Sequence, residues 1–156
     1  MLYDIISGDE SIYVSYEVAQ LLKLLGYNEL CSGYYHYYGD NEDDLWHSRF
    51  SFELCNERNF DPSSNFWRIG APTVTEANQW ILDHYSCYCV VIETSKGLCG
   101  EMWKSDNPPQ ILYKSEKTFS DREDVLNHIL EKLCNYCIDK EWWHSSSHLQ
   151  GKRKIY

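Results

Sequence analysis

The sequence predicts an α+β fold: a mostly antiparallel sheet with about three helices packed on it. Three stretches carry apolar residues at three- and four-residue steps, which is the spacing of amphipathic helices. Between them lie short runs rich in β-branched and aromatic residues, bounded by turn-forming residues. Hairpin-like connections between such runs favour antiparallel pairing with the helices on one face.

The first helix follows a short strand expected at 12–14. Ser15 is placed to cap this helix, because its side-chain oxygen can accept a free backbone N–H of the first turn. Four apolar residues then share one face: Val18, Leu21, Leu22 and Leu25. Gly26 stands where a helix commonly ends in a left-handed residue.

A hairpin is expected next. Residues 33–38 are almost all aromatic and predict a strand, 39–44 form a polar, acidic turn, and 46–54 alternate apolar and polar residues as a second strand does. The following stretch, 56–70, holds Pro62, two Ser and three Asn and is predicted to be a loop.

The second half of the chain is predicted to contain two helices with a group of strands between them. Thr73 and Glu76 fit a capping box that opens the second helix. Strands are expected at 87–94, 100–103 and 111–113, with a break at the prolines 108–109. Ser120 and Glu123 fit another capping box, and the third helix is expected to end near Asp139.

Length and composition favour one soluble domain. The chain has 156 residues, of which 43% are apolar and 24% charged, so we expect a single α+β domain over 1–140 and a polar C-terminal tail over 141–156. No apolar run is long enough to span a bilayer, and the N-terminus lacks a signal-peptide pattern. We therefore expect a cytoplasmic protein with no membrane contact and with seven reduced cysteines.

The charge disfavours nucleic acid as a direct partner. The formal net charge is −10, and affinity for a phosphate backbone comes mainly from Lys and Arg. The basic patch that stands out is Lys152, Arg153 and Lys154, a short tail of the kind that is usually just solvated.

Several segments resemble a known family. Val18-Ala19-Gln20-Leu21-Leu22-Lys23 precedes Gly26-Tyr27, and Ala71-Pro72-Thr73 leads through Gln79-Trp80-Ile81 to His84-Tyr85. Over roughly two-thirds of the chain, this pattern resembles small uncharacterised proteins of Bacteroides-type gut bacteria and their phages and mobile elements. The family's Lys-Trp-Leu-Arg element reads Gln79-Trp80-Ile81-Leu82 here. The resemblance implies a phage- or prophage-linked accessory protein and supplies no catalytic residues.

An aromatic and acidic surface is the first candidate site. The chain has thirteen Tyr, six Trp and five Phe, and such side chains suit both half-buried strands and contact surfaces. The candidate binding surface combines the tyrosines of the first hairpin with its acidic turn: Tyr34, Tyr35, Tyr37, Tyr38, Asp40, Glu42, Asp43 and Asp44. The alternative interpretation is ordinary aromatic strands ending in a solvated turn.

Cysteine and histidine provide the other candidates. Cys134, Cys137, His144 and His148 are ligand types that Zn²⁺ takes, but the six-residue gap between the pairs is too short for a zinc finger. Cys87 and Cys89 share a strand face and, with His84 and Cys99, could form a metal or redox cluster. The alternative in both cases is that the cysteines are small core residues.

These features favour a non-catalytic acidic binding or adaptor module with a protein partner, needing no cofactor, that acts on a host protein in a phage setting. An acidic surface can occupy a basic groove of another protein. Two other classes stay open: a small enzyme dependent on Cys and His or on zinc, and a structural or virion-associated protein that self-associates into a homo-oligomer through its aromatic strands.

Overall fold

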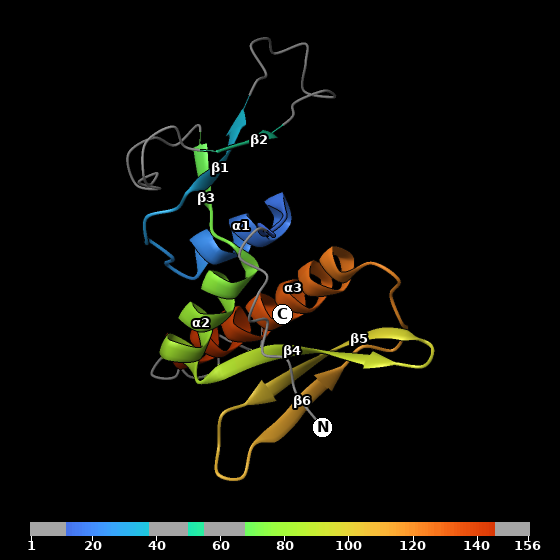
Figure 1. Cartoon of the computed structure of the whole chain (residues 1–156). Coiled ribbons are helices and arrows are strands. Elements are labelled where there is room, and N and C mark those ends of the chain that lie inside the picture. The colour runs from blue at the N-terminus through green and yellow to red at the C-terminus, as the bar shows by residue number, and fades with distance from the viewer. Residues whose placement is uncertain (1–11, 38–49, 55–67, 146–156) are drawn as a thin grey trace, which may run out of the picture.

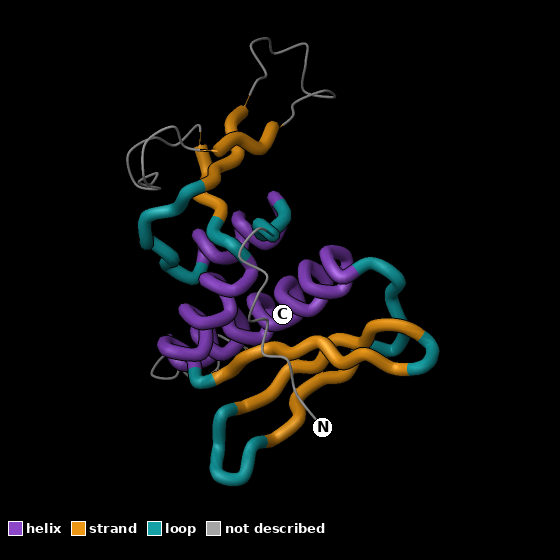
Figure 2. The backbone as a smooth tube through the Cα atoms, viewed as in Figure 1, coloured by secondary structure: helices purple, strands orange, loops and turns teal. Residues whose placement is uncertain are grey.

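In the part of the chain that the structure describes, three helices lie between two three-stranded antiparallel sheets (Figure 1). This computed structural model describes residues 12–37, 50–54 and 68–145. The predicted α+β class is confirmed. The strands, however, divide into two separate sheets, with the helices stacked between them (Figure 2).

The larger sheet comes from the second half of the chain. Strands β4 (Cys87–Thr94), β5 (Gly97–Lys104) and β6 (Gln110–Lys114) pair in the order β4-β5-β6. Helices α2 (Val74–Tyr85) and α3 (Arg122–Ser145) cover one face of it (Figure 1). The three strands expected here are confirmed, and β5 begins earlier than the predicted 100–103.

The smaller sheet contains β1 (Gly33–Tyr37), β2 (Phe50–Leu54) and β3 (Arg68–Ala71), in the order β2-β1-β3. The predicted antiparallel pairing of the first two strands is confirmed. The loop prediction for 56–70 is wrong at its end, because residues 68–70 belong to β3. A four-residue strand containing a glycine is too short to show alternation, and pairing with β1 decides its conformation. The short strand expected at 12–14 is reduced to a single bridge between Tyr13 and Thr73.

Helix α1 (Tyr16–Leu24) begins and ends as the sequence predicts. The Val18 N–H donates to Ser15 Oγ at 3.2 Å, which is the expected N-cap bond. At the other end Gly26 has φ = 95°, and the Tyr27 N–H donates to the Leu22 carbonyl at 2.9 Å. This bond across a left-handed glycine closes the helix.

The caps of the other helices differ from each other. The capping box of Thr73 and Glu76 is confirmed in both directions. The box predicted for Ser120 and Glu123 is wrong: the Glu123 N–H donates to Asp121 Oδ1 at 3.1 Å, so the cap lies one residue later. Helix α3 also runs to Ser145, beyond the predicted end near Asp139.

The main core lies where α3 crosses the larger sheet and the other two helices. It draws on every helix and on both sheets, with the most fully buried large side chains on α3: Leu126, Ile129, Leu130 and Leu133. Since α1 and α2 each contact α3, this helix holds the two halves of the molecule in place. None of the helices in the described part of the chain combines the length and apolar character that crossing a bilayer requires.

Candidate functional site: a groove between α1, β3 and α3

An open groove of about 800 Å³ runs between α1 and α3, next to β3. Its volume falls within the range of small-ligand and peptide pockets. Helix α1 supplies most of its lining, and the remaining residues come from β3 and α3. The lining residues are Glu17, Gln20, Leu21, Lys23, Leu24, Ile69, Glu131 and Asn135.

The floor of the groove is apolar and one of its leucines is unusually exposed. Leu21 and Ile69 pack against the core, whereas Leu24 is 75% exposed, the largest exposure among the large apolar residues described. Helix geometry explains the difference, because Leu24 lies away from the buried stripe that contains Val18 and Leu22. An exposed leucine inside a concave surface gives an occupant an apolar contact.

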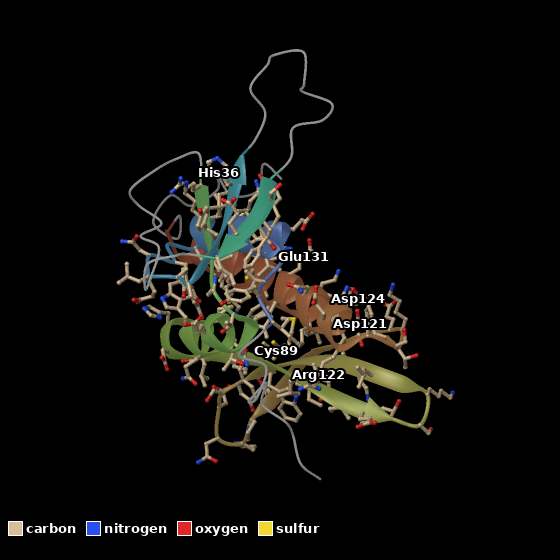
Figure 3. The ribbon with its side chains drawn as sticks, turned by 45° about the horizontal axis from the view of Figure 1, so that its top comes forward. His36, Cys89, Asp121, Arg122, Asp124 and Glu131 are labelled. Atoms are coloured by element: carbon tan, nitrogen blue, oxygen red, sulfur yellow. The ribbon has the colours of Figure 1, made fainter. Side chains whose placement is uncertain are left out.

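Carboxylates stand on both sides of this floor. Glu17 lies on α1 and Glu131 on α3, and Figure 3 shows Glu131 where α3 passes α1. Lys23 is the one cation among the described residues that line the groove. Asn135, one turn after Glu131, donates its side-chain N–H to the Glu131 carbonyl at 3.0 Å.

Tyr35, outside the groove, is influenced by carboxylates of both α1 and α3. Burial raises the pKa of Tyr35 to about 12, and the carboxylates of Glu17 and Glu123 add to this rise. Both carboxylates therefore lie close enough to disfavour a third negative charge between the two helices.

The predicted aromatic surface is only partly within the described residues. Strand alternation places Tyr34 and Tyr35 on opposite faces of the smaller sheet. Tyr35 packs edge-on against Tyr16 and Phe52, and its hydroxyl donates to the Val14 carbonyl at 2.7 Å, so it anchors the sheet to the base of α1. The side chain of Tyr37 and all of Tyr38, Asp40, Glu42, Asp43 and Asp44 lie outside the described residues. That surface stays a prediction.

The opposite face of the smaller sheet carries Tyr34 in a small polar cluster. The Arg68 guanidinium lies 5.0 Å from the Tyr34 ring centroid, and Arg68 Nε donates to His36 Nδ1 at 3.2 Å. Figure 3 shows His36 at the far end of the molecule from Cys89, so this cluster is separate from the core cysteines.

No protein-family model, curated protein or solved structure matches the chain. The resemblance to the gut-bacterial and phage family therefore stays an expectation. The geometry of the groove is what supports a function.

The cysteine candidates are core residues. Cys134 and Cys137 are buried, as the structural interpretation predicted, in the same hydrophobic core as Cys87 and Cys89 of β4. Cys99 points to the other face of the sheet, and His84 stacks on Trp80 with ring centroids 4.4 Å apart. Neither is part of that core.

The proposed zinc site is only half described. The side chain of His144 and all of His148 lie outside the described residues. Within the part of the chain that the structure describes, no three His, Cys, Asp or Glu side chains form a group suited to a metal ion. Elemental analysis of the purified protein for zinc tests this site directly.

Sequence reasoning missed the groove as a site. Its one local signal was Leu24, an apolar residue on the polar side of a well-defined amphipathic helix. The lining residues on β3 and α3 are distant from Leu24 in sequence. No local sequence pattern therefore indicated that Ile69 or Glu131 lies near Leu24.

Proposed function

We propose that this protein is a non-catalytic binding module that holds a cationic, amphipathic helical segment of a partner protein in the groove between α1, β3 and α3. The exposed Leu24 on an apolar floor, with Glu17 and Glu131 on opposite walls, is the observation that carries this proposal. In the setting that the family resemblance implies, the partner would be a host protein.

The chemistry of the groove selects this kind of occupant. Amphipathic helices bind grooves by placing apolar residues at three- and four-residue steps on the floor. Lysine or arginine residues flanking that stripe would lie against Glu17 and Glu131. With the chain at a formal net charge of −10, long-range attraction also favours the approach of a basic partner.

A synthetic peptide tests the groove. The probe is a fluorescein-labelled helix about four turns long, built of Leu and Lys in amphipathic order, and binding is followed by fluorescence anisotropy. The double variant Glu17→Lys/Glu131→Lys is expected to weaken binding at least about tenfold. Each substitution replaces an attraction between a carboxylate and the peptide lysines with a repulsion between like charges. Leu24→Ser is expected to weaken it by a smaller factor, through lost apolar contact.

A charge-matched variant separates the groove from general attraction. Glu93→Lys/Glu116→Lys changes the net charge equally at exposed positions outside the groove and is expected to change the affinity by less than about twofold. A Leu/Lys peptide of scrambled order is the second control. Equal losses in the two double variants, or equal binding of the scrambled peptide, would show that the groove is not the site.

A further inference from the structure

The apolar floor of the groove continues onto the smaller sheet. Ile69 of β3 lines the groove and pairs with Tyr35 of β1, and Tyr35 pairs on its other side with Phe52 of β2. Residues paired directly across strands place their side chains on the same face of a sheet. The three side chains therefore form one row, which starts in the groove and ends at β2, an outer strand in the order β2-β1-β3.

Helix α1 connects the groove to this row, because it packs against β3 (Figure 1). The Tyr16 hydroxyl accepts a hydrogen bond from Nε2 of Gln20, a groove residue, at 2.8 Å. The Tyr16 ring packs edge-on against Tyr35 with centroids 5.7 Å apart, and Tyr35 packs edge-on against Phe52 at 5.4 Å. These contacts link Gln20 to Phe52 through side chains that touch one another.

The far end of the row is apolar and exposed. Phe52 is 38% exposed, and Leu54, two residues later and therefore on the same face of β2, is 59% exposed. Together with Leu24 of the groove, they make up three of the five large apolar side chains that are exposed in the described part of the chain. Exposed apolar side chains gathered on one surface are typical of an interface.

The Phe52 ring is already held in place. A Cβ added at Gly33 would lie 2.6 Å from Phe52 Cζ, so the ring lies directly over the glycine. The ring also packs against Tyr13, with centroids 4.9 Å apart. A side chain that is fixed before binding loses little conformational freedom when a partner covers it. Phe52 therefore suits the role of a preformed apolar contact.

We propose that the partner segment extends beyond the groove and places a second apolar contact on Phe52 and Leu54. This inference rests on the proposed function, because it adds a second contact for the same partner. From Ile69 to Phe52 the row crosses two strand spacings, or about 10 Å. At about 5.4 Å per turn, that distance corresponds to about two turns of helix. The partner segment is therefore a helix of about six turns whose apolar stripe continues past its basic region.

Peptides of two lengths test the extension separately from the groove. The short probe is the Leu/Lys helix of about four turns described above. Two long probes carry about two further turns of Leu and Gln in amphipathic order, at the N-terminus in one and at the C-terminus in the other. One of them reaches Phe52 whichever way the helix lies in the groove, and Gln leaves the peptide charge unchanged. By fluorescence anisotropy, one long probe is expected to bind at least about fivefold more tightly than the short probe.

Two variants and one peptide control locate the gain. Leu54→Ser is expected to remove most of it and to change binding of the short probe by less than about twofold. Ile111→Ser, at a 55% exposed residue of β6 in the other sheet, is the matched control and is expected to keep the full gain. A long probe whose extension has a scrambled order is expected to bind the unmodified chain no better than the short probe, which tests the extension without any variant.

The outcomes separate the two proposals. If the short probe does not bind, the groove proposal fails and the extension fails with it. If the short probe binds but neither long probe gains affinity, or if the gain survives Leu54→Ser, the extension alone is wrong. Light scattering of the unmodified chain tests the other occupant: a dimer that Leu54→Ser dissociates would show that a second copy covers Phe52 and Leu54, which would also overturn the extension.

Discussion

Replacing Asn78 with leucine is expected to lower the free energy of unfolding by about 2–5 kcal/mol, since two buried backbone groups lose their partners at about 1–3 kcal/mol each. The Asn78 side chain donates to the Cys89 carbonyl at 3.1 Å and accepts from the Cys89 N–H at 2.9 Å. Asn78 is 3% exposed and Cys89 is fully buried, so water cannot replace either bond. The side chain takes the place of a neighbouring strand at the edge of β4.

Gln79→Leu is the matched control for this prediction. Gln79 is the next residue on α2, it is exposed, and its side-chain amide donates only to Asp83 at 2.9 Å. The same polar-to-leucine change is expected to alter stability there by less than about 0.5 kcal/mol. Urea denaturation followed by circular dichroism measures both variants. Equal stability of the two variants would mean that the bonds to Cys89 do not hold β4 against α2.

The variant Gly100→Ala is expected to cost about 3 kcal/mol, at the upper end of the usual range for overpacking. A Cβ added at Gly100 would lie 2.8 Å from Ile129 Cβ and 3.1 Å from Ile129 Cγ1. Both positions are fixed: Ile129 is fully buried on α3, and Gly100 lies in the central strand of the larger sheet. The helix must therefore move away from the sheet to admit a single methyl group.

A double-mutant cycle identifies the cause. In the Ile129→Ala background, the cost of Gly100→Ala is expected to fall in part, because the contacts with Cγ1 and Cδ1 are gone and only the contact with Cβ remains. Ser95→Ala, at the exposed β4–β5 turn, is the control and is expected to be nearly neutral. If the cost of Gly100→Ala were unchanged by Ile129→Ala, the outer atoms of the Ile129 side chain would not contribute to the loss.

Both contacts also bear on the proposed function. Asn78 fixes α2 to β4, and Gly100 sets the distance between β5 and α3. Helix α3 carries Glu131 and Asn135, which form one wall of the groove. Fixing the position of α3 therefore also fixes the shape of the groove.

Short-range signals predicted the helices well and one of their caps wrongly. The Ser15 cap, the left-handed Gly26 and the reciprocal bonds of Thr73 and Glu76 each involve residues within about one helical turn. At α3 two candidate capping residues are adjacent, Ser120 and Asp121, and Asp121 is the cap. The bridge between Leu98 and Phe119 fixes the backbone just before these two residues. That contact lies outside any sequence window around the cap.

The sequence by itself determined the fold class, the three helices and most of the strands, because periodicity and caps act between near neighbours. Tertiary structure alone decided that the strands form two sheets, that 68–71 joins β1, and that Glu17 of α1 and Glu131 of α3 line one groove. These outcomes depend on which buried surfaces pack together. The residues involved are far apart in sequence, so local sequence patterns do not predict their contacts.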